Sequence, residues 1–328
     1  MSKSVKMADI AKQLNISIVS VSKALSGVTG VSDETRKKVL DLANELGYAR
    51  PKEKISENYK KTIVVIVAEK FFGDSSFYSN MYNSLLQGLS AKGYTTLLEI
   101  ISSNNEKKAL VPNILLTKSV SAIIYMGEIN RVLINEIAKK DIPYFFLDFY
   151  DSNYNVISIV SDSCTGSYLL TKNLIDKGLT DITFVGRIDS TSSIMDRYLG
   201  YYKAMVLAGL QANVRIIDDR DENGKFIEVQ LPEKLPQALV CNCDEVAFRI
   251  VQRLRDRQIS IPKEISIIGF DGSAISEIST PSITTYKVDI QAMTKIAVST
   301  ANRLANDKVV TAQRCVVAGN FIKRDSSI

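Results

Sequence analysis

Residues 5–48 read VKMADIAKQLNISIVSVSKALSGVTGVSDETRKKVLDLANELGY and predict three short helices joined by two turns. The first helix is expected over about Met7–Leu14, where small and aliphatic residues recur at helical spacing. Asn15 follows it, and Asn enters the left-handed backbone region of a turn more easily than most residues. Ser32 is expected to cap the third helix, which Gly47 ends. This layout is typical of a helix-turn-helix DNA reader.

The second predicted helix, Ile18–Leu25, has two unlike faces. Val21, Ala24 and Leu25 share one face and must enter a small core. The other face combines aliphatic side chains, which suit thymine methyl groups, with hydroxyl and ammonium groups, which suit phosphates and base edges. The candidate DNA-binding residues lie on this helix and at the starts of the second and third helices, and they are Ser17, Ile18, Val19, Ser20, Ser22, Lys23 and Ser32.

The runs DIAKQLNIS, SVSKALSG and GVSDETRKKVLDLANELGY resemble the N-terminal domain of the lactose-repressor (LacI/GalR) family of bacterial transcription regulators. The resemblance implies that residues 1–49 form a DNA-binding domain whose second helix enters the major groove of double-stranded operator DNA. Helix-turn-helix geometry alone also fits a small helical bundle used for protein contacts. The family motif favours the DNA reader over that alternative.

Charge is distributed unevenly along the 328 residues. Residues 1–61 hold twelve Lys or Arg against seven Asp or Glu, and the remaining residues balance at 29 against 29, so the first segment carries the whole net charge of +5. A polyanion is therefore expected to bind the N-terminal part of the chain.

Composition removes several kinds of chemistry. A chain with 45% hydrophobic and 23% charged residues, no signal peptide and no long apolar run predicts a cytoplasmic globular protein without a membrane partner. It contains no His, which excludes His-based catalysis, and its four Cys predict reduced, buried thiols and no metal site. No glycine-rich phosphate-binding motif occurs, so no cofactor is expected.

Residues 50–61, RPKEKISENYKK, predict a linker. In the family that the chain resembles, this region usually forms a hinge helix with a Leu that enters the minor groove. Here the segment has no Leu and no Ala-Arg pair, so Ile55 is the candidate for minor-groove insertion, and a flexible tether is an equal alternative.

From Thr62 onward, short β-branched runs alternate with stretches of helical spacing, which predicts an α/β fold with parallel sheets. Eight or more such units exceed one sheet, so two lobes are expected. The resemblance implies a fold like that of periplasmic sugar-binding proteins, with three crossings between the lobes. The predicted N-lobe comprises residues 62–161 and about 289–311, and the predicted C-lobe comprises residues 162–288 and about 312–328.

Ligands of open α/β sheets bind beyond the carboxyl ends of the strands, here in the cleft between the lobes. Aromatic, carboxylate, amide and guanidinium groups follow the predicted strands, and together they suit sugar recognition. In the family that the chain resembles, positions equivalent to Arg197 and Asp271 hold polar groups of the effector. The candidate effector-binding residues are Phe77, Tyr78, Phe149, Ser193, Arg197, Asp244 and Asp271.

Each of these positions has a structural alternative. Phe77 and Tyr78 suit core packing at a helix start, Asp244 suits an N-cap, and Arg197 suits a surface or inter-lobe ion pair with Asp271. Cys243 stands where sugar-responsive relatives often have Asn, which weakens a simple transfer of sugar specificity.

Two further groups of carboxylates bear on enzymatic activity. The segment RIIDDRDENGK at residues 215–225 is dense in charge and predicts a solvated loop. Asp148 with Asp271 is a pair that a glycosidase could use, but binding explains the same acids.

The combined prediction is a homodimeric, effector-controlled transcription regulator that is not an enzyme. It is expected to repress genes for uptake or use of a small metabolite, with a carbohydrate as the effector. The alternatives are a small-molecule-binding module without regulatory output and an α/β enzyme.

Overall fold

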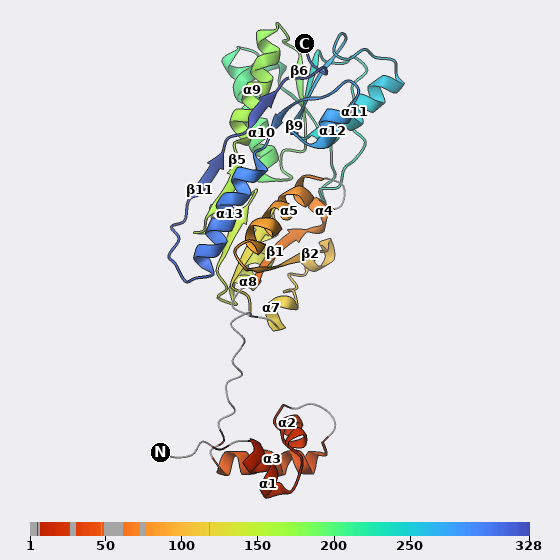
Figure 1. Cartoon of the computed structure of the whole chain (residues 1–328). Coiled ribbons are helices and arrows are strands. Elements are labelled where there is room, and N and C mark those ends of the chain that lie inside the picture. Colours follow the sequence, from red (N-terminus) through yellow and green to blue (C-terminus); the bar gives the residue numbers. More distant parts are fainter. Residues whose placement is uncertain are drawn as a thin grey trace. The chain divides into compact units, whose positions relative to one another are not determined.

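A computed structural model describes Val5, Tyr48 and residues 7–26, 31–46, 62–72, 76–117 and 119–328 (Figure 1). The chain forms two compact units, Met1–Asn58 and Tyr59–Ile328. Ile55 and Gly47, for which the sequence predicts a minor-groove contact and a helix end, lie outside the described residues. Among those residues, no helix is both long and apolar enough to span a bilayer.

The first unit contains the three predicted helices, α1 (Met7–Leu14), α2 (Ile18–Ser26) and α3 (Asp33–Glu45). Asn15 has a φ of 49°, as the predicted turn requires. The backbone N–H of Ser20 donates to Ser17 Oγ over 3.0 Å, and that of Thr35 donates to Ser32 Oγ over 3.3 Å. Both serines therefore cap their helices, which satisfies N–H groups that a helix start leaves unpaired.

A small core holds these helices together. It is formed by apolar residues from all three, namely Ile10, Ala11, Val21, Ala24, Val39 and Ala43. Larger side chains such as Leu14 and Leu42 pack against it. The face of α2 that carries Val21 and Ala24 is therefore buried in this core.

The second unit consists of two lobes, each built on a six-stranded sheet. The N-lobe sheet is entirely parallel and follows the order β11 (Arg314–Val317), β5 (Ser158–Ser161), β4 (Tyr144–Leu147), β3 (Ala122–Met126), β1 (Thr62–Ala68), β2 (Thr95–Ile101). The C-lobe sheet follows the order β12 (Asn320–Ile322), β10 (Thr284–Lys287), β9 (Ser266–Asp271), β8 (Ala238–Cys241), β6 (Ile182–Val185), β7 (Arg215–Ile217). Its one antiparallel pair is β10 with β12.

Helices cover both faces of each sheet, because side chains of a strand alternate between its faces. In β1, Ile63 and Val65 join the core under α5 (Ser76–Ser90) and α13 (Ile290–Leu304), and Val64 and Ile66 join the core under α8 (Arg131–Ala138). The other N-lobe helices are α4 (Glu69–Phe72), α6 (Ser103–Lys107) and α7 (Ile114–Thr117). The C-lobe helices are α9 (Ser163–Asp176), α10 (Ser192–Leu207), α11 (Asp244–Asp256) and α12 (Ala274–Ile278).

The sequence places the end of the N-lobe too early. Strand β11 pairs in parallel with β5, so the chain adds a sixth strand to the N-lobe before β12 joins the C-lobe sheet. The N-lobe therefore extends to Val317, beyond the predicted boundary near residue 311. A short edge strand has too few neighbours for its sequence to reveal which sheet it completes.

The three crossings between the lobes are tied to one another. The backbone N–H of Asp162 donates to the carbonyl of Val317 over 2.9 Å, and that of Gly319 donates to Tyr286 Oη over 2.7 Å. The ring of Tyr286 lies where a side chain of Gly166 would begin, 2.6 Å from the ideal Cβ position. The crossings thus form one compact pivot.

Candidate functional site

Helix α2 presents an exposed apolar and polar face. Val21 is fully buried on the core side, whereas Ile18 is 52% exposed and Val19 63% exposed on the other. Lys23 and Ser22 are exposed as well, and Ser17 Oγ lies 2.9 Å from Ser20 Oγ. Exposed aliphatic residues on a small domain have no stabilising role there, so this face is suited to a partner surface with apolar and acceptor groups.

A second candidate site lies between the lobes. We call it the inner chamber, a cavity of about 80 Å³. The N-lobe supplies residues from α4, from the start of α5 and from the end of β4, namely Lys70, Phe71, Phe77, Tyr78 and Asp148. The C-lobe supplies residues from the start of α10, from the segments that follow β7 and β8, and from the end of β9, namely Thr191, Ser193, Ile194, Arg197, Arg220, Gly224, Phe226, Asn242, Cys243 and Asp271.

Arg197 is held in place from three sides. Its Nη2 lies 3.0 Å from Asp271 Oδ1, its Nη1 donates to the carbonyl of Asn242, and its guanidinium lies 4.1 Å from the centre of the Phe270 ring. Arg197 is 5% exposed. The pair with Asp271 is therefore buried and joins two segments of the C-lobe rather than the two lobes, and both of its residues line the chamber. Arg197 Nε has no hydrogen-bond partner among the described residues.

Two chamber aspartates end strands in strained backbone conformations. Asp148 has a φ of 66° and Asp271 a φ of 104°, values that L-residues adopt rarely and that cluster at functional sites. Burial raises the pKa of Asp148 to about 6, although a 2.7 Å hydrogen bond from Tyr78 Oη to Asp148 Oδ2 opposes the effect. Asp148 Oδ1 has no partner among the described residues. Burial also raises the pKa of Asp271, and Arg197 opposes it.

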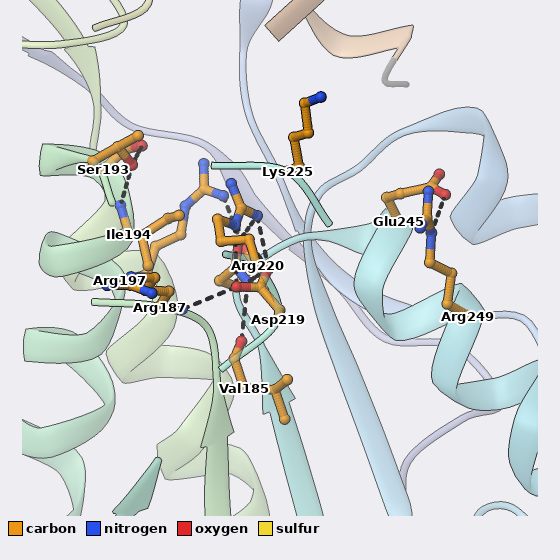
Figure 2. Close-up of polar contacts among 12 residues, drawn as sticks. Val185, Arg187, Ser193, Ile194, Arg197, Asp219, Arg220, Lys225, Glu245 and Arg249 are labelled. Atoms are coloured by element: carbon orange, nitrogen blue, oxygen red, sulfur yellow. Dashed lines mark hydrogen bonds and ion pairs between the residues drawn. The ribbon is translucent and has the colours of Figure 1, made fainter. Parts of the chain in front are cut away.

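Asp219 and Arg220 correct the prediction that residues 215–225 are a solvated loop. Asp219 is fully buried and Arg220 only 8% exposed. The Asp219 carboxylate accepts from Arg220 Nη2 over 2.7 Å, from Asn242 Nδ2 over 2.7 Å and from the backbone N–H of Arg187 over 2.9 Å (Figure 2). The many charged residues of this segment predict exposure to solvent. Asp219 is nevertheless buried, because it binds Arg187 and Asn242, which lie 32 and 23 residues away in the sequence.

Asp244 lies outside the residues that line the chamber. It is fully buried at the start of α11, and its carboxylate accepts from Thr285 Oγ1 over 2.6 Å and from the backbone N–H of Ser273 over 2.7 Å. Burial raises its pKa to about 7. Asp244 is thus neither a helix cap nor a chamber residue, and it braces the loop after β9.

Phe149 and Cys243 also differ from simple expectation. Phe149 stacks on Phe146 with ring centres 4.3 Å apart, and it lines the wider cavity between the lobes that is described below rather than the inner chamber. Cys243 does line it, and burial raises the pKa of its thiol to about 12, so the thiol stays protonated at neutral pH. The cysteines are free, with Cys241 buried but Cys164 and Cys315 only half-buried, and no group of three metal-ligating residues occurs in the described part of the chain.

A wider cavity, the outer vestibule, lies between the same lobes and has a volume of about 640 Å³. Lys70 and Thr191 line both cavities. The lobes meet around it through hydrogen bonds from the backbone N–H of Ser192 to Glu128 Oε2 (2.8 Å), from Lys107 Nζ to Asn223 Oδ1 (3.0 Å) and from Tyr150 Oη to Asp196 Oδ1 (3.0 Å). The lobes are therefore closed on each other.

Comparison with known proteins agrees with both units. A family model described as bacterial regulatory proteins, lacI family, matches residues 6–51, and one described as a periplasmic binding protein-like domain matches residues 171–327. The HTH-type transcriptional regulator RegA of Clostridium saccharobutylicum is 30% identical over 331 residues, which cover 98% of each chain.

Solved structures share the fold. The lac repressor dimer bound to operator and the anti-inducer ONPF has a TM-score of 0.69 and 20% identity, over 99% of this chain and 100% of that chain. The transcriptional regulator CelR in complex with cellobiose has a TM-score of 0.69 and 18% identity, over 98% of this chain and 100% of that chain. With a 30% identical relative matched along nearly its whole length, the chain belongs to the lacI family of bacterial regulatory proteins.

Proposed function

We propose that the protein is an effector-controlled transcription repressor that binds a near-palindromic operator as a homodimer. The observation that carries this proposal is the two-faced α2, with Val21 in the core and Ile18 and Val19 exposed. In each subunit, Ile18, Val19, Ser22 and Lys23 would meet base edges in a major groove, and Ser17, Ser20 and Ser32 would bind phosphates. A dimer is needed because one such domain contacts too few phosphates to bind tightly.

The inner chamber is the proposed effector site, with a carbohydrate as the expected class. Aromatic side chains suit sugar ring faces, and the carboxylates of Asp148 and Asp271 accept from hydroxyls. Of the seven residues that the sequence predicts, Phe77, Tyr78, Ser193, Arg197 and Asp271 line this chamber, and Phe149 lines the adjoining outer vestibule, so these six remain candidates. The fold shared with the cellobiose complex of CelR agrees with this class.

The small volume of the chamber has a mechanistic consequence. A volume of about 80 Å³ is well below the roughly 300 Å³ at the lower end of ordinary ligand pockets. The outer vestibule, which shares Lys70 and Thr191 with the chamber, is larger at about 640 Å³, and we expect the lobes to open when an effector enters the chamber itself. An effector that binds one degree of closure better than another shifts the equilibrium between them, and we expect closure to set the spacing of the two DNA-binding domains in the dimer.

DNA footprinting tests the proposal. The full chain should protect a near-palindromic segment upstream of its own operon, and one member of a panel of sugars should alter that protection. A chain that binds a sugar but leaves no footprint would be a binding module. An enzyme would convert the sugar, and Asp271→Asn would then abolish turnover in place of the effector response.

A further inference from the structure

Lys70 is a cation of the effector cleft that forms no ion pair with any carboxylate in the described part of the chain. It belongs to α4 of the N-lobe, and its Nζ lies 5.0 Å from the centre of the Phe71 ring. Glu106, Glu128 and Glu222 line the outer vestibule with Lys70, but none of them forms an ion pair with it. Its side chain reaches across to the C-lobe, where Cδ lies 3.2 Å and Nζ 4.0 Å from the ideal Cβ position of Gly224.

Gly224 belongs to the same C-lobe segment as Arg220, so Lys70 approaches the part of the cleft that Arg220 also lines. Asp219 fixes Arg220 through Nε, which donates to both carboxylate oxygens over 3.1 Å, and through Nη2, over 2.7 Å (Figure 2). The ring of Phe226 lies 4.8 Å from the guanidinium carbon. Arg220 therefore has one rigid orientation.

This arrangement leaves one edge of Arg220 available. Nη2 also donates to Asn242 Oδ1 over 3.2 Å, whereas Nη1 makes no hydrogen bond to any residue that the structure describes. Because Arg220 lines the chamber, the N–H groups of Nη1 are available to an acceptor on a bound ligand.

We propose that Arg220 and Lys70 form an anion-recognition pair, and that the effector is a polyhydroxylated molecule bearing a carboxylate or a phosphate. This inference rests on the proposed effector site and narrows its ligand class. Planar guanidinium groups bind both anions through paired N–H donors, and a lysine ammonium adds a point charge. Asp148 Oδ1, which has no partner among the described residues, accepts a hydroxyl of the same molecule.

Asp219 acts as a positioning residue in this proposal. Its carboxylate is saturated by Arg220, Asn242 and the backbone of Arg187, so it does not compete for the ligand. It orients the guanidinium before the ligand arrives, which lowers the entropic cost of binding.

Thermal shift and calorimetry on the full chain, without DNA, test the proposal. The probes are inorganic phosphate and matched sets of pentoses and hexoses, each as the neutral sugar, its monophosphate and its sugar acid. We expect an anionic member to bind and its neutral counterpart to bind at least about tenfold more weakly, the effect of losing a charge-assisted hydrogen bond. The phosphate and acid arms identify which anion is recognised.

Lys70→Gln is the main variant, because within the described ranges Lys70 forms no ion pair whose loss would destabilise the fold. It should lower affinity for the anionic probe at least about tenfold. Arg220→Lys should also weaken binding, since it keeps the charge beside Asp219 but loses the fork. Lys225→Gln is the matched control, because Lys225 is exposed on the same segment, extends away from the contacts drawn in Figure 2 and does not line the chamber.

Three results would overturn the proposal: a neutral sugar that binds as tightly as its acid or phosphate, a Lys70→Gln protein with undiminished affinity, or a panel in which neither inorganic phosphate nor any anionic sugar binds. Failure of the repressor proposal would look different. It would remove the DNA footprint while leaving anion binding in the free protein intact.

Discussion

Two valines of α2 allow a direct test of the DNA-binding face. Val19 is 63% exposed and Val21 is fully buried, although both lie on the same helix. Replacement of either by Ala removes two methyl-sized groups, worth about 0.8 kcal/mol each when buried. For Val19, only the exposed fraction remains to be buried against DNA, so Val19→Ala should cost about 1 kcal/mol in each subunit.

A homodimer on its operator contains two such contacts, so the Kd should rise by about 2 kcal/mol, or roughly 30-fold. The dependence of Kd on salt should stay unchanged, because no phosphate contact is lost. Val21→Ala should instead destabilise the first unit by about 2–3 kcal/mol, since it loses the full transfer free energy and leaves a cavity.

Fluorescence anisotropy with a DNA site selected by the wild-type protein measures the first effect, and hydrogen exchange of peptides from α1 and α3 measures the second. Val19→Ala should leave exchange within about 0.5 kcal/mol of wild type. Unchanged operator affinity in Val19→Ala would refute the assignment of this face. Equal loss of exchange protection in Val19→Ala and Val21→Ala would show that Val19 and Val21 do not differ in burial.

Three further outcomes are expected. Lys23→Ala should weaken operator binding and relax sequence preference in a binding-site selection, and unchanged affinity would remove Lys23 from the interface. Arg197→Met should abolish the effect of the effector on DNA binding in anisotropy while operator affinity without effector stays at the wild-type level. Burial raises the pKa of Asp148 from 3.8 to about 6, so the native state holds its proton more tightly than the unfolded chain does. Protonation of Asp148 should therefore raise the free energy of unfolding by about 1 kcal/mol as pH falls from about 7 to about 5. Urea unfolding at the two pH values measures this gain, and the Asp148→Asn protein should not show it.

The sequence predicts the first unit almost completely because its structure depends on local patterns. Asn15 marks the turn, Ser17 and Ser32 cap helices, and the spacing of Val21 and Ala24 identifies the buried face. Each of these features depends on neighbours within one or two helical turns.

The predictions that were wrong concern residues whose burial depends on partners that are distant in the sequence. Asp219 belongs to a charged run, and only its bond to Asn242, 23 residues away, reveals a buried position. Asp244 is predicted as a helix cap, yet Cys243 holds the cap position of α11, and Thr285 and Ser273 bind the Asp244 carboxylate. Local propensity cannot anticipate such partners, because they are brought together by the packing of whole sheets.

The buried ion pairs beside the chamber bear on how an effector would bind and dissociate. The ion pairs of Arg197 with Asp271 and of Arg220 with Asp219 are each formed within the C-lobe, so in the proposed opening that lobe would keep its half of the site assembled. The N-lobe would bring Lys70 and the Tyr78–Asp148 pair to the site only when the lobes close. Capture rates should therefore depend on C-lobe side chains, and the lifetime of the bound state on those of the N-lobe, which makes association and dissociation separately adjustable by mutation.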